Sequence, residues 1–278
     1  MRLGLLSLSV RWVFLLGVLS LSAQSRVVED GFAQLSPAEA AKTLSDFRHS
    51  GLNSDVCFKF EIVHKPRKGD SAPAVHGILW ATQAAEGSKV RVEMWKENGS
   101  LDQAFLAIKS PTQSALWQAA AGQPALLVPA GTSTAPLAAR LLLTPFDLHL
   151  PFTHWSDTQY TKTDHARGRP VHFFVAKNPA PSEPSFVIFG LDRSYGVLVQ
   201  AVSMNGQKKI TRTFQVEEFA KTDNQWILGA CSVRDESTRD VDLFKITEAA
   251  VHLALPATLF DPTTLNQATV LPANLKAL

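Results

Sequence analysis

The sequence lacks an excess of charge of either sign. Its 278 residues include 27 Lys and Arg and 25 Asp and Glu, which gives a formal net charge of +2. Arg2 and Arg11 are the only charged residues among the first 25, so the rest of the chain carries 25 charges of each sign. A neutral chain has no general electrostatic attraction to nucleic-acid phosphates or to an anionic membrane surface. We therefore expect no nucleic-acid partner.

The sequence also lacks the short motifs that mark common catalytic and phosphate-binding sites. It contains no G-x-S-x-G, no H-E-x-x-H, no C-x-x-C and no glycine-rich loop between a strand and a helix. His149 and His154 lie near Asp147, but their spacing fits no metal motif and Pro151 lies between them. Loop histidines exposed to solvent are the simpler interpretation. We therefore expect no enzymatic activity, no cofactor and no metal ion.

Cysteine is scarce. Only Cys57 and Cys231 occur, which is too few for a disulfide scaffold. An oxidising compartment would permit one disulfide between them. Two separate buried thiols are the alternative, because the distance between these residues cannot be read from the sequence.

Long apolar runs are absent except at the amino terminus. There Arg11 precedes the uncharged run Trp12–Leu21, and Ala23 and Ser25 place small residues where a signal peptidase cleaves. The run is shorter than the about 20 apolar residues of a membrane-spanning helix, which disfavours a retained anchor. No cysteine follows it for lipid attachment. The pattern predicts a signal peptide over residues 1–25, cleavage after Ser25 or Ala23, and a soluble protein outside the cytoplasm thereafter.

One helix is clearly marked near the start of the exported chain. Ser36 and Glu39 form a capping-box pattern, with Pro37 at the first helical position. Gly51 supplies a stop signal. The pattern predicts a helix from Pro37 to about residue 50.

Beyond this helix, alternation of apolar and polar side chains dominates. Val56–Ile62 and Val90–Met94 alternate with charged residues, which is typical of strands with one buried face. Similar segments recur at even spacing after position 170, separated by turn signals such as Asn205-Gly206. The predicted strands cover residues 56–62, 75–82, 90–94, 104–109, 113–119, 125–129, 171–176, 186–191, 197–204, 209–217, 225–233 and 241–247.

The alternation breaks between residues 131 and 164. Pro136–Leu143 predicts a short helix, and Thr144–Trp155 reads as an aromatic, proline-rich connection. No linker rich in Gly and Ser separates the two halves. We therefore predict a mainly β (α+β) fold, in which one strongly curved antiparallel sheet carries short helices on its concave side. An apolar cavity remains if the helices fill the curve only in part.

Large aromatic side chains concentrate in the predicted sheet and in the connection between its halves. Few polar groups accompany them, which suits a pocket that holds a ligand by apolar contact. An ordinary hydrophobic core is the alternative. The residues predicted to line the cavity are Trp80, Trp95, Phe105, Trp117, Phe146, Phe152 and Trp155.

Several segments of the second half, taken in order, resemble one protein family. They are Thr144–Trp155, Gly168–Val171, Leu191–Val197 and Leu255–Pro262. Together they look like the outer-membrane lipoprotein-sorting family, which comprises periplasmic proteins similar to the carrier LolA and has relatives in the outer-membrane receptor LolB and the stress sensor RseB. The amino-terminal half matches only in its order of helix and strands. None of these segments is a catalytic signature, so the resemblance supports the fold more than an activity.

The resemblance implies an incomplete β-barrel with helices as a lid and a cavity that takes up acyl chains. It implies a signal peptide over residues 1–25, a single domain over 26–262 and a carboxy-terminal tail over 263–278. The family's carrier has an arginine that links barrel and lid, and Arg91 is a candidate for it by strand position only. The implied function is a monomeric periplasmic carrier of lipoprotein or lipid acyl chains that exchanges cargo with membrane-bound donor and acceptor proteins.

Two other functions stay open at the level of sequence. The same fold can serve a non-catalytic periplasmic sensor or scaffold that binds a protein partner. A hydrolase acting on lipids is a third reading, and the missing catalytic motifs disfavour it.

Overall fold

The structure, a computed structural model, describes residues 32–278 except 51–53, 85–86, 110–113, 129–134 and 181. The predicted signal peptide, residues 1–25, lies outside the described residues. All described residues belong to one unit, 32–278. None of the helices in this part of the chain has the length and apolar character needed to cross a membrane.

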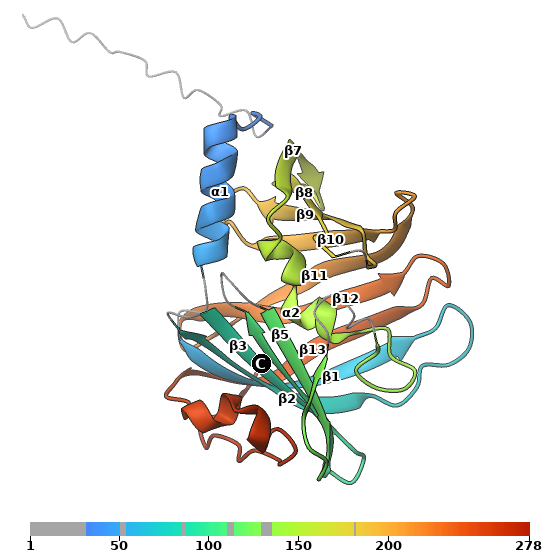
Figure 1. The fold of residues 1–278 in the computed structure, drawn as a ribbon, viewed down its shortest axis with the longest axis vertical. Coiled ribbons are helices and arrows are strands. Elements are labelled where there is room, and N and C mark those ends of the chain that lie inside the picture. Colours follow the sequence, from blue (N-terminus) through green and yellow to red (C-terminus); the bar gives the residue numbers. More distant parts are fainter. Residues whose placement is uncertain (1–31, 51–53, 85–86, 110–113, 129–134, 181) are drawn as a thin grey trace, which may run out of the picture. The chain divides into compact units, whose positions relative to one another are not determined.

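A single antiparallel sheet of 14 strands forms the body of the unit, which confirms the predicted fold class. Strands β1 to β6 neighbour one another in sequence order, and so do β7 to β13. Pairing of β1 with β13, in which Phe60 lies opposite Ile246, joins these two meanders into one curved sheet (Figure 1). Strands β6 and β7 end the path and do not pair with each other, so the sheet stays open.

Twelve of the fourteen strands overlap the predicted ranges, and β7 and β14 were not predicted. In the first meander they are β1 (Asp55–Lys65), β2 (Val75–Ala84), β3 (Gly87–Trp95), β4 (Leu101–Lys109), β5 (Ser114–Ala120) and β6 (Leu126–Val128). In the second they are β7 (Thr158–Ala166), β8 (Arg169–Lys177), β9 (Phe186–Asp192), β10 (Leu198–Met204), β11 (Ile210–Thr222), β12 (Gln225–Asp235) and β13 (Val241–Leu253). A two-residue strand, β14 (Lys276–Ala277), pairs with β13.

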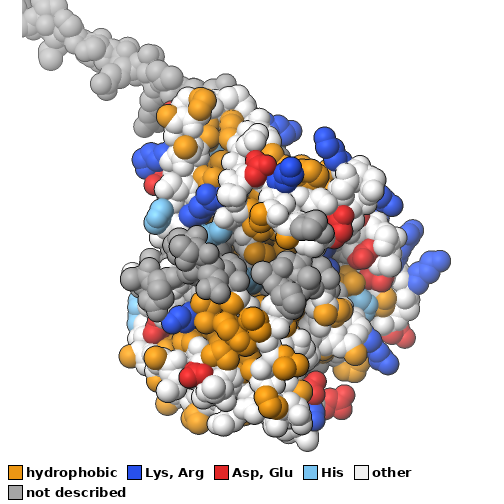
Figure 2. Space-filling view, in the orientation of Figure 1, with side chains coloured by type: hydrophobic (Ala, Val, Ile, Leu, Met, Phe, Trp, Pro, Cys, Tyr) orange, Lys and Arg blue, Asp and Glu red, His pale blue; other side chains and the backbone are white. Residues whose placement is uncertain are grey.

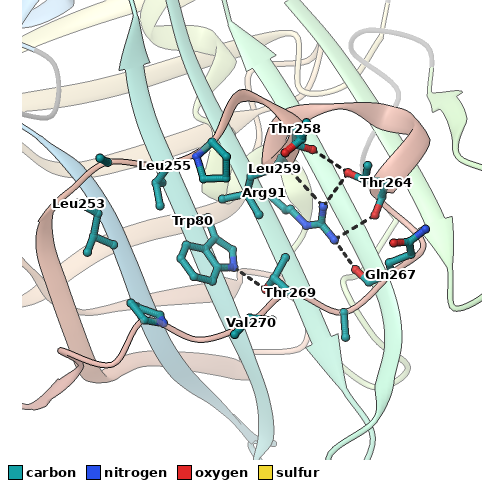
Figure 3. A pocket seen from close by; sticks show the side chains of 14 residues that line it. Trp80, Arg91, Leu253, Leu255, Thr258, Leu259, Thr264, Gln267, Thr269 and Val270 are labelled. Carbon is teal, nitrogen blue, oxygen red and sulfur yellow. Dashed lines mark hydrogen bonds between the residues drawn. The ribbon is translucent and has the colours of Figure 1, made fainter.

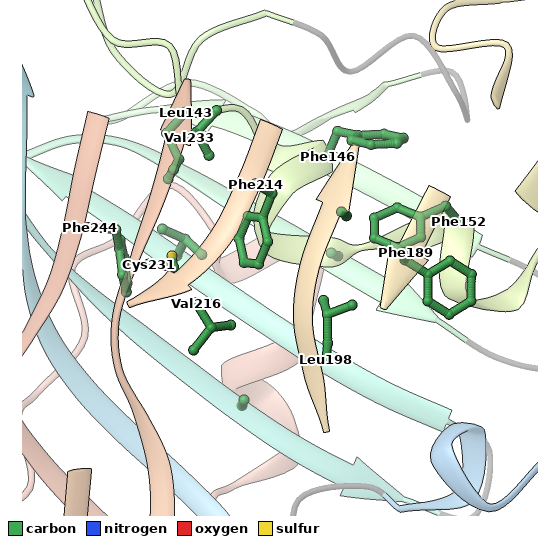
Figure 4. Close-up of a cluster of buried hydrophobic side chains, with 14 of the residues drawn as sticks. Leu143, Phe146, Phe152, Phe189, Leu198, Phe214, Val216, Cys231, Val233 and Phe244 are labelled. Atoms are coloured by element: carbon green, nitrogen blue, oxygen red, sulfur yellow. The ribbon is translucent and has the colours of Figure 1, made fainter. Parts of the chain in front are cut away.

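Alternation along the strands divides the side chains between two faces. On β1, Phe58, Phe60 and Ile62 belong to the larger buried cluster, whereas Cys57 belongs to a smaller one. We call the face with the larger cluster the inner face and the opposite face the outer face. Figure 4 shows part of the inner-face cluster.

Helix α1 (Pro37–His49) covers one part of the inner face, since its Leu44 packs into the inner-face cluster. The predicted capping box is present. The backbone N–H of Ser36 donates to Glu39 Oε2 at 2.8 Å, and the backbone N–H of Glu39 donates to Ser36 Oγ at 3.3 Å. These bonds satisfy two backbone donors that a helix start otherwise leaves without partners. The predicted helix is therefore confirmed.

The connection between β6 and β7 covers another part of the inner face. We call residues 137–155 the crossing segment. It contains helix α2 (Pro145–His149) and the 3-10 helix η1 (Pro151–His154). Its Leu137, Leu141 and Leu143 belong to the inner-face cluster, so the segment serves as a covering layer.

The predicted helix over Pro136–Leu143 is wrong. These residues form bends, a turn and irregular backbone. The backbone N–H groups of Leu142 and Leu143 donate to the Asp242 carboxylate of β13, instead of to carbonyls of a preceding helical turn. A long-range polar contact thus overrides the local helical preference.

Residues 254–278, which we call the C-terminal segment, pack on the outer face. The segment contains the 3-10 helices η2 (Ala257–Phe260) and η3 (Pro262–Thr264). Phe260 and Leu265 are buried in the outer-face cluster. The structure therefore places residues 263–278, set apart as a tail in the sequence analysis, against the sheet.

Candidate functional site

Four of the seven aromatic residues predicted to line a cavity meet on the inner face. Phe105, Phe146, Phe152 and Trp155 all belong to the inner-face cluster and are buried. The ring centroid of Phe146 lies 6.0 Å from that of Phe152 and 6.2 Å from that of Trp155. The crossing segment thus brings Phe146, Phe152 and Trp155 together against the strands. Figure 4 shows Phe146 and Phe152.

The other three lie on the opposite face. Trp80 is buried in the outer-face cluster, and Trp95 and Trp117 pack against that cluster. The strand register explains this placement, because residues opposite each other on neighbouring strands face the same side of the sheet. Trp80 lies opposite Arg91, and Trp117 lies opposite Leu106, all at outer-facing positions. These tryptophans therefore cannot share a cavity with the inner-face rings.

Three further aromatic residues, which were not among the predicted cavity residues, extend the inner-face set. Phe152 lies 5.5 Å from Phe189, Phe189 stacks on Phe174 at 5.5 Å, and Phe174 lies 5.7 Å from Tyr160, measured between ring centroids. We call these four rings the aromatic row. It leads from the crossing segment across β9 and β8 to β7. The alternation of β8 and β9 predicts buried positions for Phe174 and Phe189 but does not say that they meet.

An apolar groove opens where α1 crosses the end of the aromatic row. Its volume is about 300 Å³. Figure 2 shows hydrophobic side chains gathered over the amino-terminal half of α1. The small side chains of Ala40 and Ala41 leave the groove open between the helix and the sheet. The lining residues are Leu35, Pro37, Ala40, Ala41, Leu44, Thr158, Tyr160 and Phe174.

Buried carboxylates hold the crossing segment over the inner face. Asp242 on β13 accepts hydrogen bonds from the backbone N–H groups of Leu142 at 2.6 Å and Leu143 at 2.8 Å. Its other oxygen lies 2.7 Å from His64 Nδ1. Since Asp242 is fully buried, these contacts satisfy a group that would otherwise be costly to bury.

An arginine makes a second attachment. The guanidinium of Arg212 on β11 donates two hydrogen bonds to the Asp147 carboxylate of α2, at 3.0 Å from Nε to Oδ1 and 2.6 Å from Nη2 to Oδ2. Its Nη2 also donates to the carbonyl of Leu142. Asp147 in turn accepts the backbone N–H of Thr144 at 2.8 Å, which caps α2. Arg212 is therefore the arginine that ties the sheet to α2. Its pairing with Asp147 leaves that carboxylate committed to a structural contact rather than to a metal.

Arg91, the candidate chosen by strand position, acts on the outer face instead. Its guanidinium donates to Glu93 Oε1 at 3.0 Å. It also donates to the carbonyls of Leu259, Thr264 and Gln267 (Figure 3). Burial lowers the pKa of Arg91, and the neighbouring Glu93 carboxylate opposes that shift. Arg91 thus fastens the C-terminal segment to the sheet and does not touch the crossing segment.

A pocket of about 400 Å³ lies beneath the C-terminal segment, with Trp80 and Arg91 in its wall (Figure 3). The Trp80 indole N–H donates to Thr269 Oγ1 at 2.9 Å. Both polar groups already have partners within the chain, so this pocket presents no unpartnered cation to a ligand.

The two cysteines are free thiols on opposite faces, Cys57 outside and Cys231 inside. On β13 their partners are Ala250 and Phe244, six positions apart, which corresponds to about 20 Å along the strand. A disulfide requires Cα atoms within about 7 Å. The structure therefore does not pair them. Burial raises the pKa of Cys57 to about 12 and also raises that of Cys231, so both stay protonated near neutral pH.

Among the residues that the structure describes, no three His, Cys, Asp or Glu side chains are grouped so as to hold a metal ion.

Solved structures share this fold at low sequence identity. A DUF1329 family protein from Desulfovibrio piger matches with a TM-score of 0.70 and 10% identity, over 82% of this chain and 98% of that chain. A domain from Vibrio parahaemolyticus assigned to outer-membrane lipoprotein sorting matches with a TM-score of 0.68 and 12% identity, over 82% of this chain and 97% of that chain. A LolA superfamily protein from Nitrosomonas europaea matches with a TM-score of 0.59 and 11% identity, over 82% of this chain and 98% of that chain.

No protein-family model and no curated protein matches the sequence. The identities to the solved structures are low enough that these matches establish the fold alone, because one fold hosts many functions. At that level the resemblance to the lipoprotein-sorting family is confirmed: the chain has the LolA-like fold of an open, curved antiparallel sheet covered by short helical segments.

Proposed function

We propose that the protein is a periplasmic carrier that binds the acyl chains of lipoproteins or other lipids on the inner face of its sheet. The observation that carries the proposal is the apolar groove between α1 and β7–β8, whose wall residues Tyr160 and Phe174 belong to the aromatic row. The row continues beneath the crossing segment, which is a single layer of short elements. A chain that enters the groove would reach the rest of the inner face by displacing that layer.

The energetics suit a carrier without polar specificity. Burying one CH₂ group contributes about 0.8 kcal/mol, so a long acyl chain supplies its own binding energy. Release requires a partner or a conformation with a different affinity for the chain. The proposed carrier is non-catalytic and monomeric, and it exchanges cargo with membrane-bound donor and acceptor proteins.

The proposal includes the predicted export and organisation of the chain. Residues 1–25 act as a signal peptide, residues 26–262 form the carrier domain and residues 263–278 form its carboxy-terminal extension. The similarity in fold to lipoprotein-sorting proteins supports a periplasmic location.

Native mass spectrometry tests the carrier function. Residues 26–278 are purified from the periplasm, their intact mass is recorded, and bound lipids are extracted. We expect a stoichiometric acyl-containing species on the wild type and less of it on Ala41→Trp, because the indole fills the groove from an exposed position of α1. An unloaded mass, together with failure to take up a fluorescent fatty acid, would remove the basis for a carrier.

A second candidate is a non-catalytic sensor or scaffold that binds a protein partner. Leu126 and Leu127 are 71% and 63% exposed on β6, an end strand of the sheet. Exposed apolar residues on an end strand are typical of sites where another chain adds a strand. A chain that binds no lipid but loses a partner on substitution of both leucines by lysine would favour this function.

A further inference from the structure

Arg48, in the last turn of α1, has no carboxylate partner among the described residues. Its Nε donates to the Thr153 carbonyl at 2.7 Å, and its Nη2 donates to the Trp155 carbonyl at 2.9 Å and to Thr158 Oγ1 at 3.3 Å. No hydrogen bond of Nη1 is found in the described part of the chain. The side chain is partly buried, and burial lowers the pKa of Arg48. A positive charge that is partly removed from water without a counter-charge is unfavourable.

The position of this cation is informative. Arg48 follows Leu44 by four residues, so the two side chains lie on the same side of α1. Leu44 lines the groove, and so does Thr158, whose hydroxyl accepts from Arg48. The groove therefore has apolar walls along α1 and a guanidinium just beyond one end.

An apolar groove that ends at an unneutralised cation matches the chemistry of an anionic amphiphile. We propose that the groove binds a lipid whose alkyl chain lies along α1 and whose anionic head, a carboxylate or a phosphate, is bound by Nη1 of Arg48. This inference rests on the proposed carrier function and makes it more specific. The acyl chains of a lipoprotein end in neutral ester or amide groups, so the site would prefer lipids that carry an anionic head of their own, either free fatty acids or phosphate-headed lipids.

The physical basis for selection is the charge on the hydrogen bond. A hydrogen bond between an arginine and an anionic oxygen is about twice as strong as one between neutral groups. A neutral hydroxyl head of the same chain length gains the apolar contacts and can accept only a weaker hydrogen bond. At about 1.5–3 kcal/mol for a hydrogen bond to a charged group against about 0.5–1.5 kcal/mol for one between neutral groups, the difference corresponds to about fivefold to tenfold in affinity.

The test compares palmitate with hexadecanol, which has the same chain length and a neutral head. Dissociation constants are measured at pH 8 by displacement of a fluorescent alkyl probe from wild type, Arg48→Gln and Lys42→Gln. Lys42 is the matched control, because it is an exposed cation of the same helix whose partner is Asp46. We expect wild type and Lys42→Gln to bind palmitate about fivefold to tenfold more tightly than hexadecanol. Arg48→Gln should bind both equally.

Hexadecanol affinity is the internal check on folding, since Arg48 also holds the crossing segment. If Arg48→Gln keeps the wild-type hexadecanol affinity, its loss of head-group preference reports the missing charge alone. If Arg48→Gln binds hexadecanol more weakly than wild type, the variant Arg48→Lys, which keeps the positive charge, is measured next. Tighter binding of palmitate than of hexadecanol by Arg48→Lys supports the inference, and equal binding of the two refutes it.

The same affinities distinguish a phosphate from a carboxylate head group, and the anion site from the carrier function. Tighter binding of hexadecyl phosphate than of palmitate would assign the site to phosphate-headed lipids, and the reverse order to fatty acids. Equal binding of palmitate and hexadecanol by wild type would refute the anion site and leave the carrier function intact. Binding of neither would refute both.

Discussion

Replacing Arg91 by methionine tests what fastens the C-terminal segment to the outer face. The side chains of Arg91 and Glu93 are 2% and 0% exposed and form an ion pair at 3.0 Å. Arg91→Met leaves the carbonyls of Leu259, Thr264 and Gln267 without this donor. Each lost hydrogen bond lowers the free energy of unfolding by about 1 kcal/mol. It also leaves the Glu93 carboxylate buried without its counter-charge. Removing one member of a buried ion pair lowers the free energy of unfolding by about 3–5 kcal/mol. Because the three carbonyl bonds are lost as well, we expect a decrease near the upper end, about 5 kcal/mol.

The double variant Arg91→Met/Glu93→Gln separates the two contributions. It removes the stranded charge while the glutamine oxygen can still accept the backbone N–H of Thr269, so we expect a smaller loss of about 3 kcal/mol. Urea unfolding followed by tryptophan fluorescence measures both losses, and Lys42→Met, at an exposed ion pair, should show no measurable loss. A loss below about 1 kcal/mol for Arg91→Met, or a double variant no more stable than the single one, would refute this reasoning.

Three further outcomes follow from the packing. Gly77→Ala should lower the free energy of unfolding by about 1–3 kcal/mol in urea titrations, because a Cβ at this position would overlap the Phe60 ring and a β3 carbonyl oxygen. Asp242→Ala should lower the free energy of unfolding by about 2–4 kcal/mol and speed hydrogen exchange in the crossing segment, since a buried and a partly buried N–H group lose their acceptor. Cys57 and Cys231 should resist a thiol reagent at pH 8 in the folded protein and react fully in urea, as mass spectrometry would show.

Local signals in the sequence predicted the elements that local chemistry determines. The capping box at Ser36 and Glu39 located the start of α1, because its two reciprocal hydrogen bonds lie within four residues. Alternation located the strands with one buried face. Strand β7 was missed because it lies at the end of the sheet, and among its residues only Thr163 is fully buried. Its sequence therefore shows little apolar alternation.

The parts that the sequence did not predict depend on contacts between distant residues. Asp147 and Arg212 lie 65 positions apart, and no local pattern marks them as partners. Alternation likewise says that Trp80 and Leu79 face opposite sides of β2, but not which side is the inner one. The seven predicted cavity residues were thus divided between two faces once the sheet was assembled.

Photo-cross-linking of an acyl chain tests the central claim most directly. Residues 26–278 are loaded with a fatty acid that carries a diazirine along its chain, irradiated, digested and mapped by mass spectrometry. We predict adducts on the groove residues of α1, β7 and β8, such as Leu44, Tyr160 and Phe174, and their loss on Ala41→Trp. Adducts confined to the outer face around Trp80, or unaffected by Ala41→Trp, would show that the acyl chain does not bind in the groove.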